Sequence, residues 1–404
     1  PPKNTSMPRP NLVLIVTDQQ RGDCLGIAGH PELQTPHLDF FAASGARFTS
    51  AFSECPICIP ARHTLMTGMA PDATGCVGWA PRQRIADPSS TLPELLRKNG
   101  YQTAQIGRNM HQFPHFKRYG FEEILDDPFA DVYSRFRSIP KLTQHPDFQE
   151  WPHWMAHGLG PNGVDARAWP FDEEFHQTNF AVNKSLEWLD RRDRETPFFL
   201  SLGFIAPHPP LVPPAWFFER YLRQNLTPPA LGNWAQRPAN DGRGLAPDGA
   251  QQVLEGEPMR ETLAAYYGLL SHMDNQLNLF LSRLALEENT VVLFTSDHGE
   301  MLGDHYLWRK SAPYQGAVNI PFLLHGPQIE AQICDAPVGL QDILPTFCEL
   351  AGVEIPAHVT GKSVLRALET PTRGWIHGEH APMNHHAGFH EKRSGCPAAC
   401  GGEE

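Results

Sequence analysis

The segment Asn11-Leu12-Val13-Leu14-Ile15-Val16-Thr17-Asp18-Gln19-Gln20-Arg21 places polar side chains directly after a run of branched apolar residues. Such a run predicts a strand that is buried on both faces. Open α/β sheets bind ligands beyond the carboxyl ends of their strands, so Asp18 and Gln19 stand where a ligand would be held. Their oxygens suit calcium, magnesium or manganese. A single Asp at such a place is more often a helix cap than a metal ligand, so partners are needed.

A second segment, Thr290-Val291-Val292-Leu293-Phe294-Thr295-Ser296-Asp297-His298-Gly299-Glu300, repeats this pattern. Its apolar run predicts another buried strand, and the glycine after Asp297 and His298 permits a sharp turn. Two such strand ends can converge on one divalent cation. We therefore predict a site that offers three oxygens and one imidazole nitrogen, from Asp18, Gln19, Asp297 and His298.

Strand-like runs alternate with helical patterns along the chain. The predicted helices cover residues 36–44, 91–99, 173–191, 261–286 and 341–351. This alternation predicts an α/β fold in which helices flank a mostly parallel sheet. Residues 126–170 and 207–256 interrupt it and are typical of loops around an active-site mouth. Their tryptophans fit stacking on sugar or aryl groups and ordinary packing equally well: Trp151, Trp154, Trp169, Trp216 and Trp234.

Cys58 opens the run Cys58-Ile59-Pro60-Ala61-Arg62-His63-Thr64-Leu65-Met66-Thr67-Gly68. Residues 64–68 predict the first turns of a helix, which would put Cys58 near a positively polarised N-terminus. Cys55 and Cys58 also form a Cys-x-x-Cys pair, which is typical of a redox dithiol or half of a zinc site. The only other close cysteines are Cys396 and Cys400, far along the chain. A dithiol or zinc site is therefore the weaker interpretation.

The same run resembles the signature of the sulfatase family, in which Cys-x-Pro-x-Arg directs oxidation of the cysteine to Cα-formylglycine. The resemblance implies that the hydrated aldehyde at position 58 is the nucleophile, and that a formylglycine-generating enzyme is a partner in maturation. It also implies an alkaline-phosphatase-like α/β fold, and residue 58 as a further metal ligand beside the four named above. Ala61 replaces a serine that many members carry.

Gln19 departs from the family, where a second aspartate usually follows the first. Glutamine at this place also occurs in the related phosphonate monoester hydrolases. The exchange removes one negative charge, which weakens a preference for calcium. Calcium remains the first expectation for the single divalent cation, with manganese or magnesium as alternatives.

Two cationic side chains are implied to act on the substrate. Arg62 of the signature would pair with the formylglycine oxygens. Lys310, in Leu307-Trp308-Arg309-Lys310, resembles the lysine with which the family contacts sulfate.

Two further elements resemble proton-transfer motifs. Ile106-Gly107-Arg108-Asn109-Met110-His111 is similar to the family's Gly-Lys-x-His, with Arg108 for lysine and one extra residue before the histidine. Arg108 would then hold the formylglycine hydroxyls or sulfate, and His111 would be the base. His208, in a Pro-His-Pro context, matches the histidine near the leaving-group oxygen and would be the general acid.

Composition limits the partners. The net charge is −12, from 33 basic and 45 acidic residues, and no basic run or nucleic-acid module occurs, so we expect no nucleic-acid partner. No apolar stretch approaches the length of a membrane span, so we expect no membrane partner. The resemblance to sulfatases implies a small-molecule or carbohydrate sulfate ester as the substrate. Eight scattered cysteines mildly favour the cytoplasm, with the periplasm as an alternative if a leader was removed.

The chain is predicted to contain a catalytic domain over residues 8–370, with Met7 as a candidate natural start. Residues 371–404 resemble the entry to a small C-terminal subdomain, cut short and followed by a disordered tail. Three histidines in this part could bind adventitious metal, although a His-rich tail is the simpler interpretation: His385, His386 and His390.

Three functions are compatible with these motifs. The leading one is metal-dependent hydrolysis of a sulfate ester by formylglycine 58. The same constellation would also suit a phosphonate monoester or phosphodiester, because a tetrahedral oxyanion does not distinguish sulfur from phosphorus. A catalytically silent binding protein is the third, if Cys58 stays unmodified.

Overall fold

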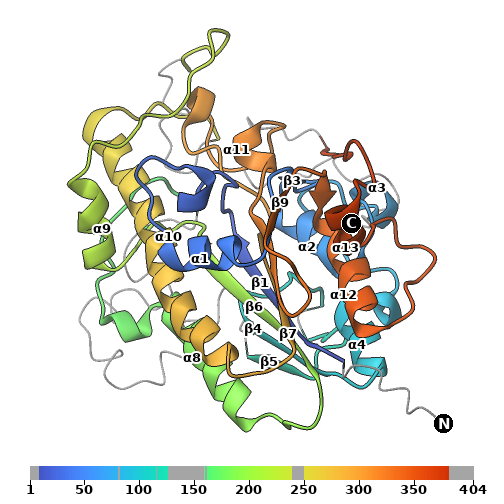
Figure 1. Cartoon of the computed structure of the whole chain (residues 1–404). Helices are drawn as coiled ribbons and strands as arrows, with labels where there is room; N and C mark the ends of the chain where they lie inside the picture. Colours follow the sequence, from blue (N-terminus) through green and yellow to red (C-terminus); the bar gives the residue numbers. More distant parts are fainter. Residues whose placement is uncertain are drawn as a thin grey trace, which may run out of the picture.

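A central eight-stranded sheet organises the protein, whose computed structural model describes residues 9–80, 82–114, 116–125, 159, 162–238 and 250–381 (Figure 1). The strand order is β5-β4-β6-β1-β7-β8-β2-β9. All neighbours are parallel except β8, which is antiparallel to β7 and β2. The predicted mostly parallel α/β class is therefore confirmed. The strands are β1 (Asn11–Asp18), β2 (Ala46–Phe48), β4 (Gln102–Gly107), β5 (Glu123–Leu125), β6 (Phe198–Pro207), β7 (Thr290–Ser296), β8 (Phe322–His325) and β9 (Gln332–Cys334).

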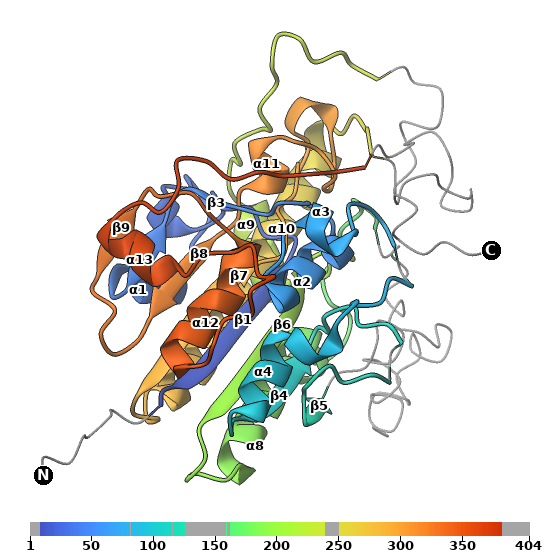
Figure 2. The ribbon, with the colours of Figure 1, turned by 90° about the vertical axis from the view of Figure 1, so that its right-hand side faces the viewer.

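Helices cover both faces of this sheet (Figures 1 and 2). The first face carries α1 (Pro36–Ala43), α8 (Gln177–Arg191), α9 (Ala215–Leu222) and α10 (Gly256–Leu284). The second face carries α2 (Cys58–Thr67), α4 (Leu92–Lys98), α12 (Ile343–Ala351) and α13 (Val364–Glu369). Strand β1 supplies both cores, because alternate side chains point to opposite faces: Val13 and Ile15 face the first set, and Leu12 and Leu14 the second. An unbroken apolar run is what such a central strand requires.

Short elements complete the described chain. Strands β3 (Ala51–Phe52) and β10 (Val338–Gly339) form a separate two-stranded pair. The single-turn helices are α3 (Pro71–Thr74), α11 (Gln315–Val318), η1 (Gly26–Ala28), η2 (Pro88–Ser90), η3 (Glu173–Phe175), η4 (Asp304–Tyr306) and η5 (Leu340–Asp342).

Four of the predicted helices match within four residues at each end, and the fifth, α10, begins at Gly256 rather than at residue 261. The earlier start is possible because Pro258 lies in the first turn, where proline is tolerated. Two other predictions were wrong. Helix α9 lies in a stretch predicted as loop, and its Phe217, Phe218 and Tyr221 are buried. Helix α2 ends, rather than begins, at residues 64–68: Gly68 terminates it with a left-handed φ of 66°.

Several predictions fall outside the described residues. They concern Trp151, Trp154, Cys396, Cys400 and the three C-terminal histidines, and the domain boundary at residue 370 stays a prediction. Trp169 is buried and packs edge-on against Phe171, so packing explains it. Among the described helices, none combines the length and apolar character needed to cross a bilayer.

Two glycines bring the ends of β4 and β6 together next to the predicted site. Gly107 has a φ of 79°, and a Cβ at this position would overlap the carbonyl oxygen of Gly203. That carbonyl accepts a hydrogen bond from the Arg108 backbone nitrogen at 2.9 Å. The close approach fixes where the Arg108 side chain starts.

We predict that Gly107→Ala is much more destabilising than Gly100→Ala. Gly100 has a similar φ of 84° but open space around its Cα, so alanine there costs only the left-handed backbone, roughly 1–2 kcal/mol. Gly107→Ala adds a steric overlap that the paired strands cannot relieve. Urea unfolding of both variants measures the difference, and equal losses would show that the β4–β6 approach is not constrained.

Candidate active site

The carboxyl ends of β1 and β7 lie side by side. Thr17 is in register with Ser296, and the Asp297 backbone nitrogen donates to the Thr17 carbonyl oxygen at 3.2 Å. Cys58 reaches the same place as the first residue of α2. The ligand atoms of Asp18, Cys58, Asp297 and His298 all lie within 4.8 Å of one another, and all four residues are buried. The predicted convergence of the two strand ends with residue 58 is therefore observed.

The contacts within this cluster suit a divalent cation. The Cys58 Sγ lies 3.2 Å from His298 Nε2 and 3.6 Å from Asp18 Oδ1. His298 Nδ1 lies 2.9 Å from the Gly299 carbonyl oxygen, so Nδ1 carries the hydrogen and the Nε2 lone pair faces the carboxylates. The carboxylates of Asp18 and Asp297 and the imidazole nitrogen of His298 surround the side chain of residue 58, and this set of groups fits a metal site. Cys55 and Cys58 are both free and buried, with no disulfide between them.

Arg62 joins the two carboxylates from within the core. It follows Cys58 by one turn of α2, so both side chains leave the same face of the helix. Its Nε donates to Asp297 Oδ2 at 2.8 Å and its Nη2 to Asp18 Oδ2 at 3.3 Å, with no exposed surface on any of the three side chains. Burial opposes the charge on Arg62, but the two carboxylates outweigh it and raise its pKa.

Asp18 stands among positive charges. Arg108 Nε donates to Asp18 Oδ2 at 2.9 Å, beside the contact from Arg62. Burial alone would raise the pKa of Asp18, but Arg108, His208 and Arg62 outweigh it and hold that pKa well below its ordinary value. Burial and the Asp18 charge together raise the pKa of the Cys58 thiol to about 12. An unmodified thiol in this form is protonated, and a poor nucleophile, at neutral pH.

His111 returns to Arg108 despite the extra residue between them. It has a left-handed φ of 53°, and its backbone nitrogen donates to Asn109 Oδ1 at 3.0 Å. This turn brings His111 Nε2 to 3.1 Å from Arg108 Nη2. Burial and the charge of Arg108 lower the pKa of His111 well below its ordinary value, which favours the neutral imidazole.

His208 follows β6 and lies over the end of β1. Its backbone nitrogen donates to the Asp18 carbonyl oxygen at 3.1 Å, and its Nδ1 lies 2.6 Å from the Pro209 carbonyl oxygen. Burial and the charge of Lys310 lower the pKa of His208 well below its ordinary value.

Lys310 and Gln19 belong to a network that includes a residue without a predicted role, Glu300. Lys310 Nζ donates to Gln19 Oε1 at 2.5 Å, and Gln19 Nε2 donates to Glu300 Oε2. The amide oxygen of Gln19 is thus tied to the lysine, and its role as a metal ligand stays a prediction. Glu300 carried one signal in the sequence, its position two residues after His298, and the structure buries it beside the site.

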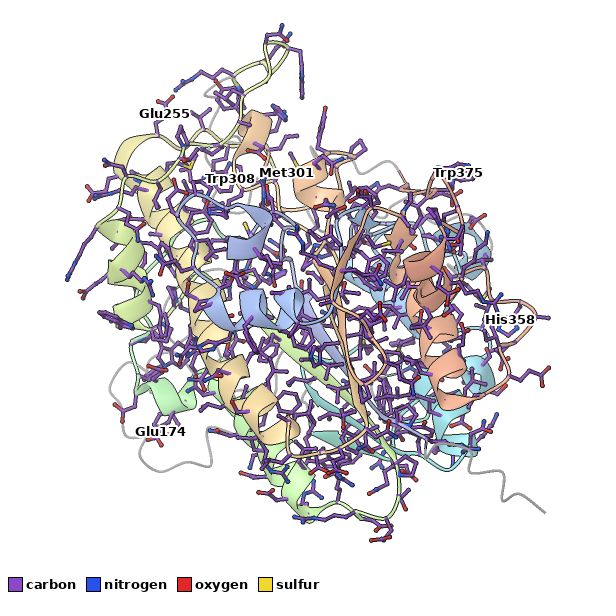
Figure 3. The ribbon with its side chains drawn as sticks, viewed as in Figure 1. Glu174, Glu255, Met301, Trp308, His358 and Trp375 are labelled. Carbon is purple, nitrogen blue, oxygen red and sulfur yellow. The ribbon has the colours of Figure 1, made fainter. Side chains whose placement is uncertain are left out.

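Glu300 also anchors the loop that carries Lys310. Its Oε1 accepts hydrogen bonds from the backbone nitrogens of Leu302, at 2.9 Å, and Arg309. Between residues 302 and 311, five side-chain-bearing residues have positive φ angles of 50° to 70°, an unusual concentration of strained backbone. Figure 3 labels Met301 and Trp308, which lie in this loop above the strand ends.

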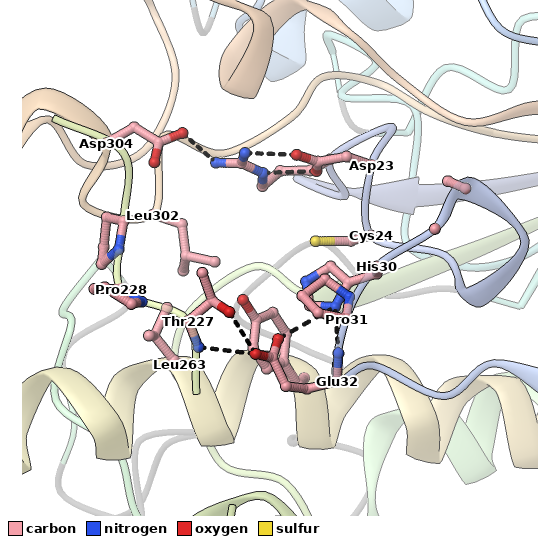
Figure 4. A pocket seen from close by; sticks show the side chains of 15 residues that line it. Asp23, Cys24, His30, Pro31, Glu32, Thr227, Pro228, Leu263, Leu302 and Asp304 are labelled. Atoms are coloured by element: carbon pink, nitrogen blue, oxygen red, sulfur yellow. Dashed lines mark hydrogen bonds and ion pairs between the residues drawn. The ribbon is translucent and has the colours of Figure 1, made fainter. Parts of the chain in front are cut away.

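A cavity of about 300 Å³ lies beside this loop (Figure 4). Arg21 spans it and pairs with Asp23 at 2.7 Å and with Asp304 at 2.8 Å. Its walls include none of the predicted catalytic or metal-binding residues. The Arg21 pairs therefore fasten the loop after β1 to the loop that carries Lys310.

Two supporting contacts had no local signal in the sequence. Ser53 Oγ donates to the Asp297 carbonyl oxygen at 2.6 Å, and Tyr266 Oη donates to the Gln19 carbonyl oxygen at 2.7 Å. Ser53 precedes β7 by more than 200 positions, and only the folded topology brings these groups together.

Comparisons with known proteins agree with this geometry. A family model described as Sulfatase matches residues 10–353. An arylsulfatase of Clostridium perfringens is 35% identical over 397 residues, which cover 92% of this chain and 82% of that protein. A choline-sulfatase of Rhizobium meliloti is 29% identical, with 86% of this chain and 68% of that protein covered.

Solved structures show the same fold. The phosphonate monoester hydrolase of Agrobacterium radiobacter superposes with a TM-score of 0.72 at 24% identity, covering 91% of this chain and 79% of that one. A protein solved with its substrate D-glucosamine-2-N,6-O-disulfate superposes with a TM-score of 0.68 at 20% identity, covering 93% and 82%. With a family model over most of its length and a relative at 35% identity, this chain belongs to the sulfatase family, hydrolases of sulfate esters with an alkaline-phosphatase-like fold.

Proposed function

We propose that this protein hydrolyses sulfate monoesters, with formylglycine formed from Cys58 as the nucleophile and one divalent cation held by Asp18, Asp297, His298 and residue 58. The observation that supports this proposal most strongly is the buried cluster of these four side chains. One of them, Cys58, is the first residue of the modification signature. Calcium is the first candidate, because the two carboxylates are hard oxygen donors.

The modified residue and the cation each have one part in this proposal. The hydrated aldehyde supplies a hydroxyl that attacks sulfur and a second hydroxyl whose deprotonation later expels sulfate. The cation supplies positive charge that stabilises the anionic ester and lowers the pKa of the attacking hydroxyl. The formylglycine-generating enzyme would act before folding, because Cys58 is only 2% exposed in the folded chain.

The side chains around the cluster fit the remaining roles. Arg62 and Arg108 hold negative charge at residue 58 and Asp18. Lys310 is placed to contact sulfate, and the neutral imidazole of His111 can accept a proton. His208 is the candidate acid for the leaving alcohol; an anionic substrate beside it would raise its lowered pKa, because an opposite charge favours the protonated form.

A second activity, on phosphonate monoesters, is favoured by one observation. Gln19 directly follows Asp18 at the end of β1, where the sulfatase pattern usually has a second aspartate, and the phosphonate monoester hydrolase of Agrobacterium radiobacter has the same fold. Sulfate remains first, because the arylsulfatase of Clostridium perfringens shares a higher identity with this chain than that hydrolase does.

The nucleophile is tested with Cys58→Ala and the matched control Cys55→Ala. Cys58→Ala should reduce turnover of 4-nitrophenyl sulfate by about 10³-fold or more, because the covalent step is lost, while Cys55→Ala leaves the signature complete and retains activity. Peptide mass spectrometry of the wild type should show position 58 with one oxygen in place of sulfur and two hydrogens.

The outcomes separate the three candidate functions. Faster turnover of phenyl phosphonate esters than of aryl sulfates would favour the second activity. Unmodified Cys58 with no turnover of either ester would leave a binding protein. Equal losses in the two cysteine variants would favour a dithiol instead.

The metal site is tested without turnover. Calcium added to chelator-treated protein should raise the melting temperature by a few degrees, because a ligand of the folded state stabilises it by mass action. Asp297→Asn should abolish this shift, and Asp165→Asn, on the surface, should retain it. The same shift in both variants would place the cation elsewhere.

Glu300 is tested as a positioning residue for Lys310. Glu300→Gln places an amide against backbone donors and loosens the strained loop, so we expect kcat/KM to fall about 10- to 100-fold. The exposed Glu330→Gln serves as control. If the calcium-induced melting shift persists while kcat/KM falls, Glu300 acts through the loop rather than the metal; unchanged kcat/KM would contradict the role.

A further inference from the structure

Three aromatic side chains form a cluster, in which Trp234 from the loop after α9 packs against His305 and Tyr314 of the segment that follows β7. The indole of Trp234 stacks on the Tyr314 ring, with centroids 5.5 Å apart and planes inclined by 15°. The His305 ring lies 4.6 Å from the indole and 5.4 Å from the Tyr314 ring. Trp234 is nevertheless 54% exposed. One side of the indole is therefore covered by its neighbours, and much of the remainder is open to solvent.

The backbone around Trp234 is firmly attached to this segment. Ala230 donates to Asp304 Oδ1 at 2.8 Å, and its carbonyl oxygen accepts from the His305 nitrogen at 2.8 Å. Gly232 donates to His305 Nδ1 at 2.9 Å. The absence of a Cβ at Gly232 also lets the indole lie against the chain, since a Cβ there would stand 2.5 Å from Trp234 Nε1. The open indole is thus held in place before any ligand arrives, which lowers the entropic cost of binding.

The cluster stands within reach of the candidate active site. Tyr314 follows Lys310 by four residues, so their Cα atoms are at most about 14 Å apart. Ser311, between them, donates to the carbonyl oxygen of Pro56 at 3.1 Å, two residues before Cys58. Tyr314 also precedes α11, whose Gly316 and Ala317 carbonyl oxygens accept from the backbone just after Asp297 and His298. A sulfate ester bound at Lys310 would extend its alcohol portion over a distance of this order.

We propose that Trp234, supported by Tyr314 and His305, binds a ring in the alcohol portion of the sulfate ester, so that the preferred substrates are ring-bearing, aryl or pyranose, sulfates. An exposed, rigid aromatic face suits such rings, because both aryl faces and the C–H faces of sugars pack on it while hydroxyl groups stay in water. A short linear alkyl group has no ring to offer. This inference rests on the proposed sulfatase function, whose anion site fixes one end of the substrate.

Equilibrium binding tests the proposal separately from catalysis. Titration calorimetry would compare Cys58→Ala with Cys58→Ala/Trp234→Ala, using calcium-loaded proteins and three ligands: 4-nitrophenyl sulfate, glucosamine 6-sulfate and inorganic sulfate. Loss of the stacking face should weaken binding of one or both ring-bearing esters about fivefold to tenfold, and leave inorganic sulfate within about twofold. The two ring-bearing ligands distinguish an aryl from a sugar preference.

The matched control is Trp216→Ala in the same background. Trp216 is 67% exposed on α9, outside the cluster, and its removal should not alter binding of any of the three ligands. Trp234→Phe keeps an aromatic face and should restore most of the lost affinity. Equal binding of the ring-bearing esters with and without Trp234, or a parallel loss for inorganic sulfate, would overturn the proposal. If the wild type hydrolysed no sulfate ester, that result would count against the proposed function. The role of Trp234 would still be decided by the binding measurements, which do not depend on turnover.

Discussion

The compensation of buried charge at the ends of β1 and β7 is the constraint on which the rest of the structure depends. Asp18 and Asp297 have no exposed surface, and an isolated buried carboxylate is costly. Arg62 bridges both carboxylates, and Arg108 adds a second contact to Asp18. Helix α2, strand β4 and the two central strands must therefore keep a fixed arrangement, because the displacement of one leaves a charge without a partner.

This arrangement also explains how an acidic protein can attract a sulfate ester. The chain carries a net charge of −12, so its overall field opposes an anion. Around the cluster, however, three cationic side chains, Arg62, Arg108 and Lys310, lie beside the two carboxylates, and a bound cation would add further positive charge. Arg62 and Arg108 are buried and Lys310 is partly buried, so these local charges are screened less than distant surface charges that water and salt attenuate.

At this site the strand ends position the buried cluster, and a strained loop positions Lys310. The strand ends and the first turn of α2 hold the metal-site cluster itself, whereas residues 303–314 carry Lys310 and two of the three clustered aromatic residues, His305 and Tyr314. That segment adopts several left-handed backbone conformations and is held by Glu300 and Arg21. Conformations of this kind persist only where surrounding contacts over-determine them, and here those contacts connect directly to the residues proposed for catalysis.

The sequence by itself determined the fold class, the strands β1 and β7, and the residues that meet at their ends, because buried parallel strands and a modification signature are local patterns. It placed the start of α2 at residue 64 instead of residue 58 and predicted a loop where α9 lies, since prolines before each helix resemble loop composition. Only the tertiary structure decided that Gln19 contacts Lys310 and Glu300, that His111 turns back onto Arg108, and that Trp234 is exposed while Trp169 is buried. The turn at His111 depends on a left-handed backbone that the pattern of residue types does not reveal. The other outcomes depend on which distant segments pack together, and packing between segments more than 200 positions apart leaves no periodic signal in either one.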